Sequence, residues 1–357
     1  MSGTPSERVH SGTNHVGADA LVCSAERSSA VLRLGDLLIP STLFAVVLVA
    51  FWFLAQHFSL SQRIGGFPST FIAFALIFTP YWFFAFGAAA LLRHSLSTRT
   101  LRVLAPGLFV LPYLVYALPR AEFRVSFFFI FLAVPIGVSA LFEFLPPGGS
   151  HPATPKITWQ DVLVLAILGL PIEFNWFRAS FPHEGLSSFP KLLMVDAALY
   201  AFLVVRPLND VGYDLRPRAR DLTIGLRELV FFAPVVIALG LVLHFITPHG
   251  GLPPAATAVS ALLITFFFVA IPEELFFRGL LQNLLEGRIG YVRSLAIAAI
   301  VFGLSHFNKP GPFNWRYVLL ATIAGVFYGR AWRDRRRLLA SAITHTLVDV
   351  LWILWFR

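Results

Sequence analysis

The stretch AIPEELFFRGLLQ, from Ala270 to Gln282, places two adjacent carboxylates and one arginine inside a long apolar run of the chain. Charged side chains are costly within a membrane, so they are found there mainly where they pair with each other or serve a function. The first question is therefore whether the chain around this stretch belongs in a bilayer.

The composition of the whole chain answers that question. Its 357 residues are 57% hydrophobic and 13% charged, and the mean hydropathy is +0.74. A soluble domain has roughly 45–50% apolar and about 25% charged residues. The excess of apolar residues is gathered in runs at 37–60, 67–92, 101–119, 123–144, 160–177, 190–206, 224–247, 256–284, 291–307, 316–332 and 338–356.

About 20 apolar residues cross the hydrocarbon core of a bilayer, and only helices or closed barrels do so. The runs lack the alternation of apolar and polar residues that a barrel strand requires. The sequence therefore predicts an all-α, polytopic transmembrane bundle of about eleven spans. Lipid is the expected surrounding of most of the chain.

The positive charges indicate an orientation and exclude one class of partner. The net charge is +9, but lysine and arginine lie in short loops rather than on one face, which argues against nucleic-acid binding. With a cytoplasmic N-terminus, 19 of these residues lie on the cytoplasmic side and 8 on the other, and Arg278 lies within a span. This bias predicts a cytoplasmic N-terminus and a C-terminus outside.

The pattern also predicts three parts. Residues 1–35 are rich in small and polar residues and are expected to form a disordered cytoplasmic tail. Residues 36–206 form a block of about six spans, and 207–357 form a block of five. The single cysteine, Cys23, excludes an intrachain disulfide and a metal site built from several cysteines.

The carboxylates of the opening stretch differ in their expected partners. Glu274 and Arg278 are four residues apart, so they share one helix face and can pair. Glu273 is turned about 100° away and has no such partner in its own helix. An unpaired carboxylate at this depth needs an explanation from another span.

Two later spans carry candidate partners. Phe302 and His306 share one helix face in the ninth run, and His345 and Asp349 share one in the eleventh. A carboxylate beside an imidazole can take a proton from water and create a hydrolytic nucleophile, and a second histidine can stabilise an oxyanion. Two histidines and a carboxylate are also the ligand set of a catalytic zinc, here Glu273, His306 and His345.

The order of these motifs resembles the CPBP family, which includes type II CAAX prenyl endopeptidases and the Abi and bacteriocin-processing or immunity membrane proteins. The resembling residues are Glu273-Glu274-x-x-x-Arg278, Phe302-x-x-x-His306 and His345-x-x-x-Asp349, on successive apolar runs between about 224 and 356. The resemblance identifies 207–357 as an intramembrane protease domain. It names no counterpart for the first six spans.

The resemblance also implies a role for each matching residue. Glu273 would activate water with the help of His306, while His345 and Asp349 would stabilise the oxyanion. Glu274 and Arg278 would be a supporting pair, and Phe302 would pack beside the pocket. Asp349 is unusual in an oxyanion site, because an ionised carboxylate cannot donate a hydrogen bond, so it either orients His345 or is protonated.

We expect no cofactor, with zinc as the alternative, and a membrane-associated peptide or protein as the substrate. Two other functions remain open from the residues alone. A non-proteolytic scaffold or immunity protein would retain the same fold, and a proton-coupled transporter would use the buried carboxylates but usually shows internal repeats. Glu173 and Asn175, near the end of the fifth run, are interpreted as interfacial residues, although they could mark a substrate groove.

Overall fold

A computed structural model describes residues 34–356, except 148–155, 252, 310 and 312. Nearly all of the predicted tail, residues 1–35, lies outside the described part. Each of the eleven predicted runs contains a helix, and the described residues form no β-strand. The prediction of an all-α bundle is confirmed.

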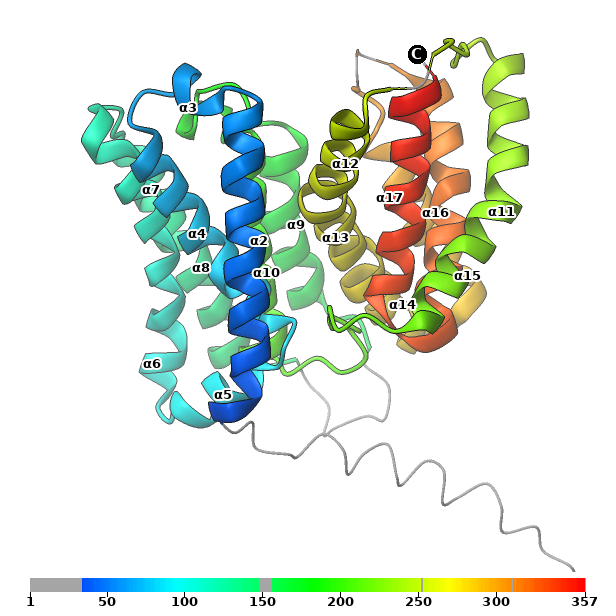
Figure 1. Cartoon of the computed structure of the whole chain (residues 1–357). Helices are drawn as coiled ribbons and strands as arrows, with labels where there is room; N and C mark the ends of the chain where they lie inside the picture. The colour runs from blue at the N-terminus through cyan, green and yellow to red at the C-terminus, as the bar shows by residue number, and fades with distance from the viewer. Residues whose placement is uncertain (1–33, 148–155, 252, 310, 312, 357) are drawn as a thin grey trace, which may run out of the picture.

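The helices form two adjacent groups, coloured blue to green and green to red in Figure 1. The first group consists of α2 (Leu38–His57), α3 (Leu60–Arg63), α4 (Phe67–Phe84), α5 (Ala88–Ser95), α6 (Arg99–Leu104), α7 (Leu111–Ala117), α8 (Val125–Phe144), α9 (Trp159–Glu173) and α10 (Ser188–Leu199). The second group consists of α11 (Ala219–Val242), α12 (Ala255–Ile264), α13 (Ile271–Glu274), α14 (Asn283–Ile289), α15 (Tyr291–Leu304), α16 (Trp315–Arg335) and α17 (Leu338–Trp355).

Eight helices in the described residues are long and apolar enough to cross a membrane. Three further predicted spans, α9, α15 and α16, are helices as well, but α9 and α15 have 15 and 14 residues and α16 carries several charges. The first and last long helices, α2 and α17, begin and end at opposite ends of the bundle (Figure 1), as an odd number of crossings requires. Which end faces the cytoplasm stays a prediction.

Aromatic side chains join the two groups into one core. The ring of Phe267 lies 5.7 Å from Phe51 of α2 and 5.6 Å from Phe78 of α4, measured between ring centroids. The hydroxyl of Tyr81 donates a hydrogen bond of 2.9 Å to the carbonyl of Phe267. Edge-to-face aromatic pairs of this kind add packing energy beyond buried area. The two groups therefore share one core, and the division into two blocks near residue 206 stays a prediction.

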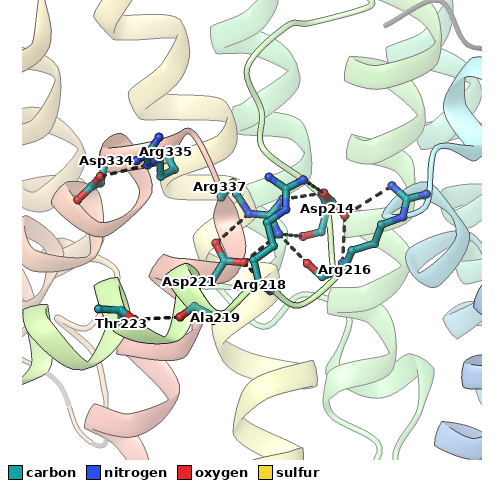
Figure 2. Close-up of polar contacts among 9 residues, drawn as sticks. All are labelled: Asp214, Arg216, Arg218, Ala219, Asp221, Thr223, Asp334, Arg335 and Arg337. Atoms are coloured by element: carbon teal, nitrogen blue, oxygen red, sulfur yellow. Dashed lines mark hydrogen bonds and ion pairs between the residues drawn. The ribbon is translucent and has the colours of Figure 1, made fainter. Parts of the chain in front are cut away.

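The segment that links the groups is fixed by a buried arginine. Arg337, between α16 and α17, is 7% exposed. Its guanidinium donates to Asp214 at 2.6 Å and to both carboxylate oxygens of Asp221 at 2.8 and 2.9 Å (Figure 2). In the sequence, Arg337 is one of the 19 basic residues that indicate a cytoplasmic side, and no further role is predicted for it. The hydrogen bonds of Arg337 raise its pKa above the usual value, although its partial burial acts to lower it.

The opening stretch lies in one continuous helix from Ala255 to Ile289. Two π-helical segments, η7 (Thr265–Ala270) and η8 (Leu275–Gln282), flank the short α13. Pro272 in α13 cannot donate a backbone hydrogen bond, and wider turns accommodate such a break without ending the helix. The irregular part of the helix carries Glu273 and Glu274.

Candidate active site

The predicted pair of Glu274 and Arg278 is present and fully buried. Arg278 Nε lies 3.2 Å from Glu274 Oε2, and neither side chain has exposed surface. The hydroxyl of Ser341 donates to the same carboxylate oxygen, and Nδ1 of His345 lies 2.8 Å from the other one. A buried carboxylate is tolerated only when it is paired and hydrogen-bonded in this way. Glu274 therefore joins its own helix to α17.

Aromatic rings enclose the guanidinium of Arg278. Its central carbon lies 4.6 Å from the centroid of Phe302, 5.6 Å from Tyr328 and 5.8 Å from Phe277. The faces of aromatic rings attract cations, and they do so more strongly where water is excluded. Phe302 thus supports the arginine, in addition to packing against the rings of His306 and His345.

Glu273 faces two basic side chains from other helices. Its Oε1 lies 3.0 Å from Nζ of Lys191 in the first turn of α10, and its Oε2 lies 4.0 Å from Nε2 of His345. Its side chain is 21% exposed, whereas that of Glu274 is not exposed at all. The two adjacent carboxylates therefore have different surroundings, as their positions on the helix predicted.

His345 is held between carboxylates. Nδ1 meets Glu274, while Nε2 faces Glu273 and lies 3.5 Å from Oδ2 of Asp349. Its ring stacks on Tyr328 with centroids 4.5 Å apart and planes 15° apart. Both ring nitrogens can donate at once only in the imidazolium form. His345 is oriented by the hydrogen bond that its Nδ1 donates to Glu274, since its distance to Asp349 is too long for a good hydrogen bond.

His306 lies near Glu273 without touching it. Nδ1 of His306 is 2.9 Å from the carbonyl of Phe302, so this nitrogen carries a hydrogen, and Nε2 is an acceptor when the ring is neutral. The ring packs edge-on against Tyr317, with centroids 4.5 Å apart. No hydrogen bond or ion pair joins His306 to Glu273 among the described residues, but the two are close enough to interact electrostatically.

A pocket of about 410 Å³ opens beside Glu273, between α9 and α10 on one side and η8 and α15 on the other. Most of its lining is apolar, including Leu165, Leu168, Met194, Phe276, Leu280 and Val301. Its wall is tightly packed where α9 approaches η8, because a Cβ on Gly169 would lie 2.7 Å from the ring of Phe276. An apolar pocket with a few convergent polar groups is typical of a binding site for a small or extended ligand.

The segment that carries these site residues matches a known protein family. Residues 254–351 match the family described as type II CAAX prenyl endopeptidase Rce1-like. This segment belongs to the CPBP family. The match contains all seven residues of the predicted site, from Glu273 to Asp349. No curated protein and no solved structure matches the chain.

The CPBP family is a family of membrane proteases, and this chain is an integral, multi-pass membrane protein. Helices α2 to α11 lie outside the CPBP segment. The pocket beside Glu273 is therefore built partly from helices that the family match does not include.

Two of the three donor side chains of the alternative zinc site have other partners. No group of three His, Cys, Asp or Glu side chains is placed to hold a metal ion in the part of the chain that the structure describes. Oε1 of Glu273 is paired with Lys191, and Nδ1 of His345 is paired with Glu274, so neither atom is free to bind zinc. The residues do not fit this metal site as they are arranged, and no step is derived through a metal.

Sequence reasoning missed two contributors from outside the CPBP segment. Lys191 is one of the 8 basic residues that the charge pattern places outside, yet it lies in α10 and pairs with Glu273. Glu173, interpreted as interfacial, pairs with Lys309 at 3.2 Å across the two groups of helices. Both contacts join residues far apart in the sequence, and no local pattern marks them. Asn175, the other interfacial candidate, has a positive φ of 55° and occupies a turn after α9.

Proposed function

We propose that the protein is a glutamate-dependent intramembrane endopeptidase that hydrolyses a peptide bond of a membrane-associated substrate. The observation that carries this proposal is that Nε2 of His345 faces both Glu273 and Asp349, at 4.0 and 3.5 Å, while Glu273 lines an apolar pocket. Membership of the CPBP segment in a protease family supports it.

In the proposed reaction, Glu273 takes a proton from a water molecule with the assistance of His306. The hydroxide adds to the scissile carbonyl carbon, and Nε2 of His345 donates a hydrogen bond to the developing oxyanion. When the carbon–nitrogen bond breaks, the proton passes to the leaving amine. General-base catalysis and oxyanion stabilisation are each worth about 10²–10⁴-fold in comparable sites.

Glu274 and Arg278 are assigned a supporting role. Their charges balance each other, and Glu274 fixes the ring of His345 through Nδ1. Because that hydrogen bond already sets the ring, Asp349 is not needed to orient it. Phe302 completes this support by packing against Arg278 and both histidines.

The proposal is tested with full-length protein in lipid vesicles and two quenched fluorescent peptides. One carries a prenylated cysteine followed by two aliphatic residues and a terminal residue, and the other has the same sequence without the prenyl group. We expect the prenylated peptide to be cleaved at one bond, located by mass spectrometry. The reason is that an apolar prenyl group suits the apolar pocket beside Glu273. A protein that binds the peptides but cleaves neither would instead support the non-proteolytic scaffold.

A substitution at Asp349 separates its two possible roles. Asp349→Asn should keep kcat within about threefold of wild type, because an amide can donate to an oxyanion and Glu274 still orients His345. Asp349→Leu should lower kcat by about 100-fold, because no polar group then remains at this position. A loss in Asp349→Asn as large as in Asp349→Leu would show that the negative charge itself is needed.

A further inference from the structure

Lys191 is the nearest cation to the carboxylate at the centre of the proposed mechanism, and it comes from outside the family match. It lies in the first turn of α10, 82 positions before Glu273, and its Nζ is 3.0 Å from Glu273 Oε1. The two side chains are 22% and 21% exposed, so the contact is partly shielded from solvent. Helix α10 packs directly on α13.

The charge of Glu273 requires such a partner. Arg278 is committed to Glu274 at 3.2 Å, and the nearest nitrogen of His345 is 4.0 Å away. An ionised carboxylate in an apolar segment is stabilised by an opposite charge and by hydrogen bonds. Lys191 supplies an opposite charge and a hydrogen bond to one oxygen of Glu273, Oε1.

The contact also fixes how Glu273 points. With Oε1 bound to Lys191, the second oxygen, Oε2, is turned towards His345. Oε2 is therefore the oxygen that remains free to accept a proton from water. It lies beside His345, which would donate a hydrogen bond to the oxyanion. Catalytic groups work best when their rotamer is locked by neighbours, because small misplacements are costly.

We propose that Lys191 is a positioning residue for hydrolysis, which neutralises Glu273 and holds Oε2 towards the reacting carbonyl. This inference rests on the proposed function of Glu273. It gives the first group of helices a role in the reaction, because the site is incomplete without α10.

The competing interpretation is that Lys191 only fastens the two groups of helices together. The chain contains a matched control for this, since Lys309 and Glu173 form a second ion pair between the same groups at 3.2 Å. That pair does not involve Glu273. Glu173→Gln breaks it and keeps Lys309, whose charge also acts on Glu273 from a longer distance, so the cations around the carboxylate are unchanged.

The test measures kcat and KM of full-length protein in vesicles with the prenylated reporter peptide. Lys191→Met should lower kcat by about 100-fold with KM changed by less than about threefold, as expected for a displaced general base. Lys191→Arg should recover at least about a tenth of wild-type kcat, because it keeps the cation. Glu173→Gln should lower the unfolding temperature about as much as Lys191→Met does, with any kinetic change confined to KM, because Glu173 lines the pocket.

Three results would overturn the inference. The first is a kcat for Lys191→Met close to that of wild type, and the second is an equal loss of kcat in Glu173→Gln. The third is a Lys191→Arg variant no more active than Lys191→Met. If Glu273→Gln is inactive while Lys191→Met is fully active, only the role of the lysine fails. If Glu273→Gln remains active, the proposed function fails first.

Discussion

Glu273→Gln should lower kcat for the prenylated reporter peptide by about 1,000-fold or more, within the range expected for loss of a general base. Glutamine has nearly the same shape as glutamate, but its amide cannot accept a proton from water at neutral pH. The pocket and the packing of α13 should be unchanged. The measurement is the initial rate of cleavage at saturating peptide, together with the unfolding temperature.

The control for this variant lies on the same continuous helix. Glu286→Gln removes a carboxylate from α14, 13 positions beyond Glu273, where it pairs with Arg333 and Arg336 away from the pocket. Its kcat should match that of wild type. Cleavage by Glu273→Gln above about a tenth of the wild-type rate would remove Glu273 from the role of general base.

Arg278→Met should destabilise the fold by about 3–5 kcal/mol, because it leaves the charge of Glu274 buried with too little compensation. Both side chains are fully buried, so water cannot take the place of the guanidinium. Methionine retains much of the volume between Phe302 and Tyr328, which separates loss of charge from loss of packing. Denaturant or thermal unfolding of the purified protein in detergent measures the effect.

Two further variants make this measurement specific. Arg333→Met removes an arginine that is 43% exposed, and Arg336 still pairs with Glu286, so the loss should be at most about 1 kcal/mol. The double variant Glu274→Gln/Arg278→Met should be more stable than Arg278→Met alone, since no unpaired charge remains. If Arg278→Met and Arg333→Met lose equal stability, the buried pair does not have the importance assigned to it.

Much of the fold follows from the sequence because apolar length and helix formation are tightly linked in a membrane. All eleven predicted runs contain helices, and the bundle is all-α. The errors lie at breaks within runs. The run at 67–92 was predicted as one element, but α4 ends at Phe84 and α5 begins at Ala88, after Gly87 with a φ of 95°. A hydropathy profile does not reveal this turn, because the turn residues are as apolar as the helices on either side.

In the site, too, local contacts could be predicted from the sequence and contacts between distant helices could not. The pairing of Glu274 with Arg278 was predictable because it is local, four residues along one helix. The contacts of Glu274 with His345 and of Glu273 with Lys191 join residues 71 and 82 positions apart. They depend on how helices pack, which one sequence does not specify. The roles assigned to Glu273, His306, His345 and Asp349 remain predictions until the variants above are measured.

The aromatic core shared by the two groups of helices has a consequence for biosynthesis. Tyr81 and its acceptor Phe267 are 186 positions apart, so α4 enters the membrane long before its partner is translated. At about 5–20 residues per second, the wait is roughly 10–40 seconds. During that interval α4 can already pack on α7 and α10, but the faces of α2 and α4 that contact Phe267 lie against lipid. A ribosome stalled before residue 267 would leave a membrane-inserted fragment with this aromatic surface exposed to lipid.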